Sequence, residues 1–209
     1  MNLAAPHLAI LSPAEGGVLA VLAGTDRPLS GREVARIGGQ PKSTVARVLQ
    51  RLVEHGVVDA REAGAGAALL YVLNREHLAA ESLEALVTLR RRLIERLAGD
   101  LATWSVPPHH ASLFGSTARG DGSTHSDIDL FLVRPVGVAA DDPRWREQLD
   151  RLAARVERWT GNHASVAEVS LDDVARLARE RPPVVTELTR DAITLLGPPT
   201  RQVFEGAVT

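Results

Sequence analysis

Apolar residues recur at intervals of three or four positions in three successive segments near the start of the chain. The first two segments follow capping boxes, Ser12-Pro13-Ala14-Glu15 and Ser30-Gly31-Arg32-Glu33, in which a Ser and a Glu bind each other's backbone N–H groups. Glycines follow each segment, as they commonly do at helix ends. The pattern predicts three short helices, lying between Ser12 and Gly24, between Ser30 and Gly38, and between Pro41 and Gly56.

The pattern then changes from helical to strand-like spacing and back. Val57–Arg61 and Ala68–Leu73 flank Gly64-Ala65-Gly66, which predicts a β-hairpin with a glycine-rich turn. From Glu76 to Trp104 the spacing predicts one long helix with an apolar stripe, either continuous or interrupted near Gly99-Asp100. This stripe either packs on a neighbouring domain or forms the seam of a homodimer. Arg90-Arg91-Arg92, in its middle, is expected to be a solvated face.

The remainder of the chain alternates short apolar runs with amphipathic segments after Pro107-Pro108. Helices are expected from Gly115, from Pro143 to Gly161, and on both sides of Pro182-Pro183. The last few residues are expected to be frayed. The pattern predicts four strands, at Ala111–Phe114, Asp127–Val133, Ser165–Ser170 and Ala192–Leu196.

The N-terminal order of three helices and a hairpin is that of a winged helix-turn-helix domain. The run from Gly39 to Val58 resembles the recognition helix and first wing strand of bacterial regulators. In such regulators the first residues of the recognition helix face base edges in the major groove of double-stranded DNA. Alternatively the module contacts protein or only packs on its neighbour. Glu54 and Glu62 dilute its positive charge, which favours this alternative. The exposed candidates for DNA binding are Gln40, Lys42, Ser43, Thr44 and Arg47.

The most informative motif is a Gly-Ser turn followed by two carboxylates set two residues apart. Phe114-Gly115-Ser116-Thr117-Ala118-Arg119-Gly120-Asp121 precedes Ser126-Asp127-Ile128-Asp129-Leu130. On a strand the two acids project together, while the alternating apolar residues point into the core. Adjacent carboxylates repel each other unless a cation lies between them. Mg²⁺ suits such oxygen ligands and shares its shell with substrate phosphates.

This motif resembles the signature of the DNA polymerase beta-like nucleotidyltransferases, especially the minimal members of that superfamily. The resemblance implies that Gly115 and Ser116 contact the triphosphate and that Asp127 and Asp129 bind metal. It also implies a C-terminal mixed sheet flanked by helices, so the expected fold class is α+β. The expected domains are a winged helix-turn-helix domain over residues 1–78, a linker helix over 79–106 and a nucleotidyltransferase domain over 107–209.

A two-metal site of this family needs a third acid on an adjoining strand. Glu168 is the carboxylate of the run Ser165–Ser170, so it is the expected third ligand, with a role as general base as the alternative. Asp172 is a more distant rival. Arg119 is expected to reach the phosphates, the alternative being an ion pair with Asp121.

Composition limits the remaining function classes. The 209 residues carry a formal net charge of −2, which excludes a globally basic nucleic-acid binder, so any DNA contact must be a local patch. Without cysteine the chain has no disulfide framework and no thiolate metal site. No long apolar run or signal peptide is evident, so we expect a cytoplasmic protein without a membrane segment.

The sequence therefore predicts a Mg²⁺-dependent transferase carrying a DNA-binding domain. It is expected to use ATP, or another nucleoside triphosphate, and to transfer the nucleotidyl group to a hydroxyl with release of pyrophosphate. Minimal members resembling this chain often modify a partner protein as antitoxins, which makes a protein hydroxyl one acceptor and a small molecule such as an aminoglycoside another. The alternative function is a DNA-binding regulator whose nucleotidyltransferase domain only senses nucleotide or is inactive.

Overall fold

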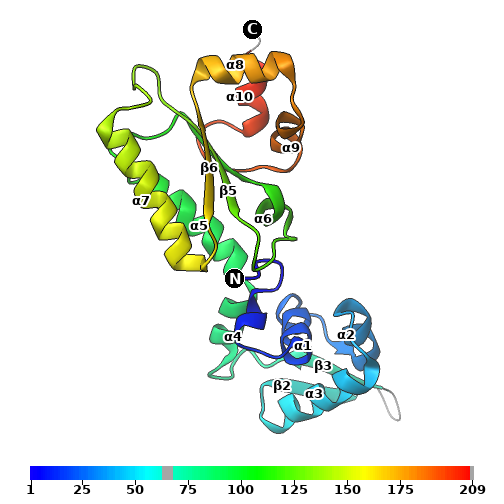
Figure 1. Cartoon of the computed structure of the whole chain (residues 1–209). Coiled ribbons are helices and arrows are strands. Elements are labelled where there is room, and N and C mark those ends of the chain that lie inside the picture. Colours follow the sequence, from blue (N-terminus) through cyan, green and yellow to red (C-terminus); the bar gives the residue numbers. More distant parts are fainter. Residues whose placement is uncertain (63–67, 208–209) are drawn as a thin grey trace. The chain divides into compact units, whose positions relative to one another are not determined.

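The computed structural model describes residues 1–62 and 68–207, which form two compact units (Figure 1). One unit comprises Ala5–Leu89. The other comprises Met1–Ala4 together with Arg90–Thr209. The chain therefore crosses between the units twice, after Ala4 and after Leu89.

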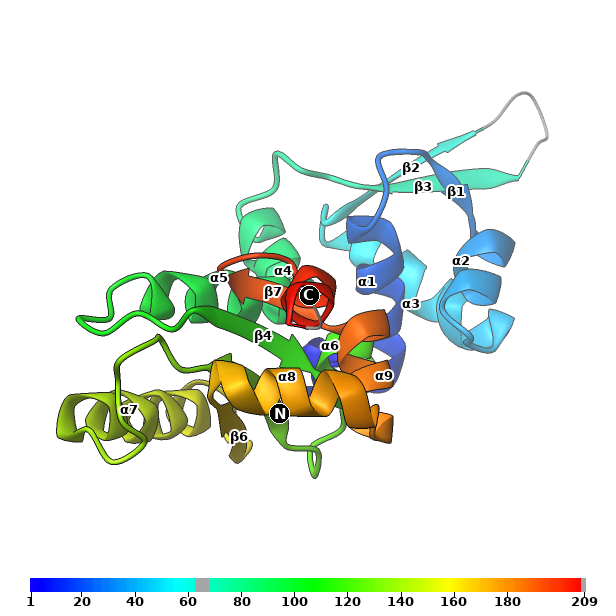
Figure 2. The ribbon, with the colours of Figure 1, turned by 90° about the horizontal axis from the view of Figure 1, so that it is seen from above.

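The N-terminal unit is built on the three predicted helices, α1 (Pro13–Ala23), α2 (Gly31–Ile37) and α3 (Lys42–Glu54), preceded by a short 3-10 helix, η1 (Pro6–Ala9). Apolar side chains of all three α-helices form one core. The sheet strands lie along one side of these helices (Figure 2). The strands are β1 (Leu29–Ser30), β2 (Val58–Glu62) and β3 (Leu69–Leu73), in the order β1-β3-β2.

The predicted hairpin is confirmed, because β2 and β3 pair antiparallel from Val58↔Leu73 to Glu62↔Leu69. The predicted turn, Gly64-Ala65-Gly66, lies outside the described residues.

The expectation of one long helix from Glu76 to Trp104 is wrong, and the break is at Thr88 and not near Gly99-Asp100. The segment forms α4 (Ala80–Val87) and α5 (Leu89–Leu101), separated at Thr88, whose hydroxyl donates a hydrogen bond to the carbonyl of Glu84 (2.8 Å). The apolar stripe is divided as well. Leu83 packs against the core of the N-terminal unit, whereas Leu93 and Leu97 are buried in the core of the other unit.

The C-terminal unit contains a four-stranded mixed sheet in the order β6-β5-β4-β7. Its strands are β4 (His110–Phe114), β5 (Ile128–Val133), β6 (Ala164–Val169) and β7 (Ile193–Leu196). The central pair, β4 and β5, is antiparallel, and β6 is parallel to β5. The expected α+β architecture with a mixed sheet is therefore confirmed.

Helices cover both faces of this sheet (Figure 1). On one face, α5 and α7 (Pro143–Thr160) pack on Ile128, Leu130 and Leu132. On the other face, Phe131 and Val133 contact three helices, α8 (Leu171–Glu180), α9 (Pro183–Asp191) and α10 (Thr200–Gly206). Helix α10 was not predicted, and it forms because Val203 and Phe204 are buried. Of the last few residues, which were expected to be frayed, 208 and 209 lie outside the described residues.

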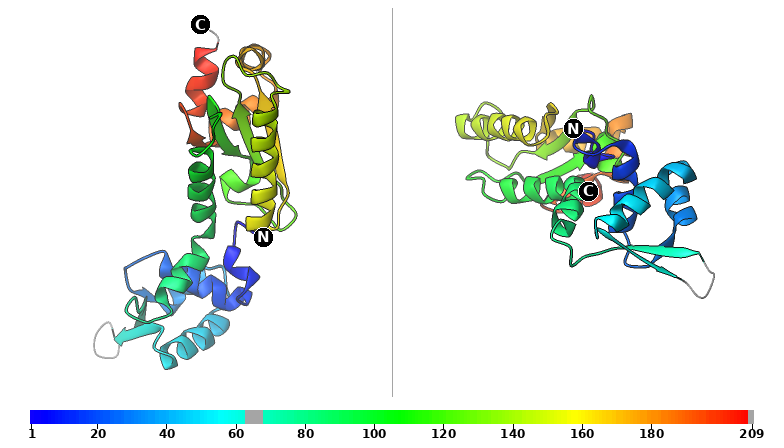
Figure 3. Two further views of the ribbon diagram at one scale, coloured as in Figure 1. Left: turned by 90° about the vertical axis from the view of Figure 1, so that its left-hand side faces the viewer. Right: turned by 90° about the horizontal axis from the view of Figure 1, so that it is seen from below.

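The first four residues belong to the C-terminal unit because they bind its loops. The amino group of Met1 donates to the carbonyl of Thr160, at the end of α7 (2.9 Å), and the N–H of Ala4 donates to the carbonyl of Gly122 (3.1 Å). The N-terminus accordingly lies beside the end of α7 (Figure 3). Gly122 lies in the loop that precedes the acid pair.

Across the described residues, no helix has both the length and the apolar content that crossing a bilayer requires.

The capping box of α2 makes a pH-dependent contribution to stability. Glu33 accepts hydrogen bonds from the backbone N–H and hydroxyl of Ser30 (both 2.9 Å) and pairs with Arg27 (3.1 Å). These contacts lower the pKa of Glu33 from 4.5 to about 2. A carboxyl whose pKa falls on folding stabilises the folded state above its unfolded pKa, and this contribution is lost as the pH falls.

We therefore expect Glu33→Gln to flatten the acid side of the stability profile. The melting temperature of the wild type should fall more steeply than that of the variant between about pH 5 and pH 3. Circular dichroism melts across this range measure the difference, with exposed Glu62→Gln as the matched control. Parallel profiles for wild type and Glu33→Gln would contradict the assignment.

Candidate active site

The Gly-Ser turn and the acid pair meet at one end of the central strands. Strand β4 ends at Phe114 and leads directly into the short helix α6 (Gly115–Arg119), and Phe114 is the register partner of Asp129 on β5. Gly115 has a φ of +67°, which side-chain-bearing residues rarely adopt, and a Cβ there would collide with the Asp129 carboxylate. The turn therefore needs glycine for two independent reasons.

Asp127 and Asp129 lie close enough for their charges to interact. Asp127 is exposed immediately before β5, and Asp129 is half-buried on it. Burial raises the pKa of Asp129, the negative charges of Asp127 and Glu187 raise it further, and Arg119 opposes them. Two carboxylates whose charges repel each other are a chemically suitable pair of ligands for a divalent cation.

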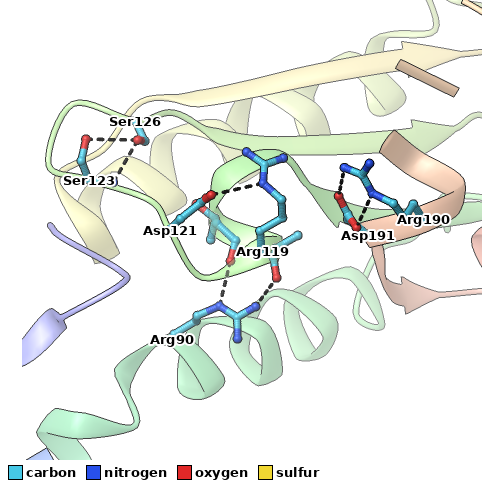
Figure 4. Close-up of polar contacts among 9 residues, drawn as sticks. Arg90, Arg119, Asp121, Ser123, Ser126, Arg190 and Asp191 are labelled. Carbon is cyan, nitrogen blue, oxygen red and sulfur yellow. Dashed lines mark hydrogen bonds and ion pairs between the residues drawn. The ribbon is translucent and has the colours of Figure 1, made fainter. Parts of the chain in front are cut away.

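Arg119 is at the end of α6 and is more than a third exposed. Its Nε donates to Asp121 at 3.3 Å, the ion pair that the sequence left as the alternative to phosphate binding (Figure 4). Exposed pairs of this kind contribute little to stability, so the guanidinium can exchange this partner for another anion.

The structure corrects the expectation that Glu168 is the third metal ligand. In the pairing of β5 with β6, Ser165 lies beside Asp129 and Glu168 lies beside Leu132. Glu168 is therefore three positions, or about 10 Å, further along the strand than Asp129. Side chains alternate along a strand, so Glu168 also projects from the opposite face of the sheet to Asp129. Its carboxylate forms an ion pair with Arg134 instead.

The charge of one acid that the sequence did not single out, Glu187, acts on Asp129. Asp129 is on the same face of the sheet as Phe131, the face that α9 covers, and α9 also packs against α6. Glu187 is on α9, and its charge raises the pKa of Asp129. Nothing in the local sequence marks this glutamate, because its relevance depends on where α9 packs.

The described residues contain no group of three or more His, Asp or Glu side chains arranged to hold a metal ion. The two motif aspartates can fit one cation whose other ligands come from water and phosphate, which is how proteins usually hold Mg²⁺. The predicted set of three protein carboxylates, with Glu168 among them, is not formed.

The candidate DNA-binding residues are at the start of α3 and just before it. Lys42, Ser43 and Arg47 are exposed, as expected. Thr44 is half-buried, and Gln40 is half-buried because its side chain lies against Gly17 of α1. The expectation that Gln40 and Thr44 are exposed is therefore wrong.

Comparison with known proteins gives two domain matches. The IclR helix-turn-helix domain matches residues 17–62, and the nucleotidyltransferase domain matches residues 94–186. A search of curated proteins finds no match to this chain.

Two solved structures are also similar. One is a crystal structure of a toxin-antitoxin with AMP-PNP, at 16% identity and a TM-score of 0.35. The other is a mutant of the toxin-antitoxin MntA-HpeT, at 16% identity and a TM-score of 0.32. Each comparison covers 57% of this chain and 83% of the other. Superpositions this poor say nothing about function.

The first domain match includes most of α1, all of α2 and α3, and strands β1 and β2, but not β3. The β4–α6–β5 motif lies within the second match. The chain thus carries a segment that matches the IclR helix-turn-helix domain, followed by a segment that matches the nucleotidyltransferase domain.

Proposed function

We propose that this protein transfers a nucleotidyl group from a nucleoside triphosphate, with ATP as the first candidate, to a hydroxyl acceptor, and that it binds double-stranded DNA through its helix-turn-helix domain. The observation that carries the enzymatic proposal is the contact between Gly115 and Asp129, which unites the two halves of the motif at one point.

The proposed roles follow from the position of each group. Ser116 and the backbone of the Gly115 turn bind the triphosphate, and Arg119 leaves Asp121 to pair with a phosphate oxygen. Asp127 and Asp129 hold Mg²⁺, which when bound supplies Lewis-acid activation and charge neutralisation. The acceptor oxygen forms a bond to the α-phosphorus, the bond to pyrophosphate breaks, and the hydroxyl proton is released. Glu187 supplies the third negative charge of the site from α9.

The acceptor is proposed at the level of chemistry only. A hydroxyl on a partner protein and a hydroxyl on a small molecule such as an aminoglycoside both fit the transfer.

A second candidate function is supported by one observation. Because Glu168 is on the opposite face from Asp129, the predicted trio of carboxylates is not formed. This supports a DNA-binding regulator whose nucleotidyltransferase domain binds nucleotide without transferring it.

The first test separates these two functions. Incubation with ATP labelled at the α-phosphate, Mg²⁺ and candidate acceptors should give labelled product, and Asp129→Ala should reduce it at least about 100-fold by removing a metal ligand. Exposed Asp150→Asn on α7 is the control and should transfer normally. Nucleotide binding by the wild type without any transfer would instead establish the regulator.

The second test compares one chemical change at two glutamates. Glu187→Gln should lower the transfer rate about tenfold or more, whereas Glu168→Gln should leave it within about threefold of the wild type. Removing the charge of Glu168 leaves Arg134, which is only 12% exposed, without its partner, so the melting temperature should fall by about 2–6 °C. The reverse pattern of rates would show that Glu168 belongs to the active site and that Glu187 does not.

The third test concerns DNA. Arg47 is exposed on α3, so Arg47→Ala should weaken binding to duplex from the protein's own upstream region about tenfold or more in a gel shift. Arg158→Ala, an exposed arginine of the other unit, is the matched control. No shift by the wild type even at low salt would contradict DNA binding.

A further inference from the structure

Helix α6 is too short to hold itself in place. It has five residues and ends at Gly120, whose φ is +84°. The N–H groups of Gly120 and Asp121 both donate to the carbonyl of Ser116 (3.0 Å each). The last carbonyls of a helix have no partner within it, and isolated helices of this length are unstable. The orientation of α6 therefore depends on contacts from outside.

Arg90, the second residue of α5, supplies such a contact. Its Nε donates to the carbonyl of Thr117 at 2.8 Å, and its Nη2 donates to the carbonyl of Ala118 (Figure 4). These carbonyls belong to the last turn of α6, where positive charge is also favourable to the helix dipole. The planar guanidinium binds two adjacent acceptors in one fixed geometry, which a lysine cannot do.

The neighbouring arginines do not share this role. Arg91 is 72% exposed and forms an ion pair with Glu95 at 3.7 Å, one turn further along α5. Arg92 is exposed as well. The expectation that the whole triplet is a solvated face is therefore wrong for Arg90, which is half-buried.

We propose that Arg90 is a positioning residue for the nucleotide site, fixing α6 so that Ser116 and Arg119 face the triphosphate. This inference rests on the proposed nucleotidyl transfer. Its proposed action is exerted through the backbone of Thr117 and Ala118.

The expected kinetic effect is specific to the triphosphate. Without Arg90, the two carbonyls lose their donors and α6 samples other orientations, so binding of the phosphates weakens. Arg90→Ala should raise the KM for ATP about tenfold or more and leave the KM for the acceptor within about twofold. Arg90→Lys keeps the charge and one donor, so it should recover part of the loss.

The experiment uses the full chain, with Arg91→Ala and Arg92→Ala as matched controls that remove an equal charge from the same helix. Steady-state kinetics give KM and kcat. Amide hydrogen exchange at Gly120 and Asp121 reports whether α6 is held, and should be faster in Arg90→Ala alone. A purely stabilising role would lower the melting temperature and the active fraction without changing the KM for ATP.

Two outcomes would overturn the inference, and neither is the same as failure of the proposed function. An unchanged KM for ATP in a folded Arg90→Ala variant would show that Arg90 does not position the site, whatever the exchange rates. Unchanged exchange would show that α6 does not depend on Arg90. If the wild type transfers no label, the proposed function fails, while the exchange comparison still tests the contact with α6.

Discussion

The arrangement of the candidate site depends on the close approach of the Asp129 carboxylate to the backbone of Gly115. A hydrogen at Cα is all that this position can carry, since a Cβ would occupy the space of the carboxylate oxygen. The antiparallel register Phe114↔Asp129 brings the two together, and buried Leu113 and Leu130 on the neighbouring positions fix that register. The packing of the sheet thus determines which groups meet at the end of its central strands.

The same approach has an electrostatic cost. Asp129 is half-buried beside another carboxylate, an arrangement that burial and like charge both disfavour. Structures keep such arrangements where a ligand compensates for them, which is why perturbed carboxyls concentrate at functional sites. Arg119 gives partial compensation from α6. The acid pair is thus better suited to binding a cation than to stabilising the empty fold.

Local patterns predicted much of the fold and the centre of the site. Capping boxes and apolar spacing were sufficient for α1, α2 and α3, and the Gly-Ser and Asp-Ile-Asp motifs identified the residues that the structure brings together at Gly115 and Asp129. These signals lie within short runs of the sequence, so they can be recognised without knowledge of the tertiary packing.

The failures all concern long-range packing. Glu168 was predicted as a metal ligand because it is on the strand next to β5. Strand register and the face from which a side chain projects determine its neighbours, and neither places Glu168 beside Asp129. Glu187 and Arg90 lie near the motif only because α9 packs against α6 and Arg90 of α5 binds the backbone of α6, and no run of adjacent residues encodes these contacts. Helices α4 and α5 are separate because the apolar residues of the predicted stripe pack in two different hydrophobic cores, one in each unit. Gln40 lies against a glycine of another helix.

The two crossings of the chain between its units converge on one short stretch of backbone. Ala4, the last residue before one crossing, binds Gly122, and Arg90, the first after the other, binds Thr117 and Ala118. Residues 117–122 are thus bound by the residues that flank both crossings, and all of these residues belong to the C-terminal unit. Thermodynamic linkage is reciprocal, so a ligand that orders residues 117–122 strengthens the contacts of Ala4 and Arg90 by as much free energy as these contacts add to the binding of that ligand.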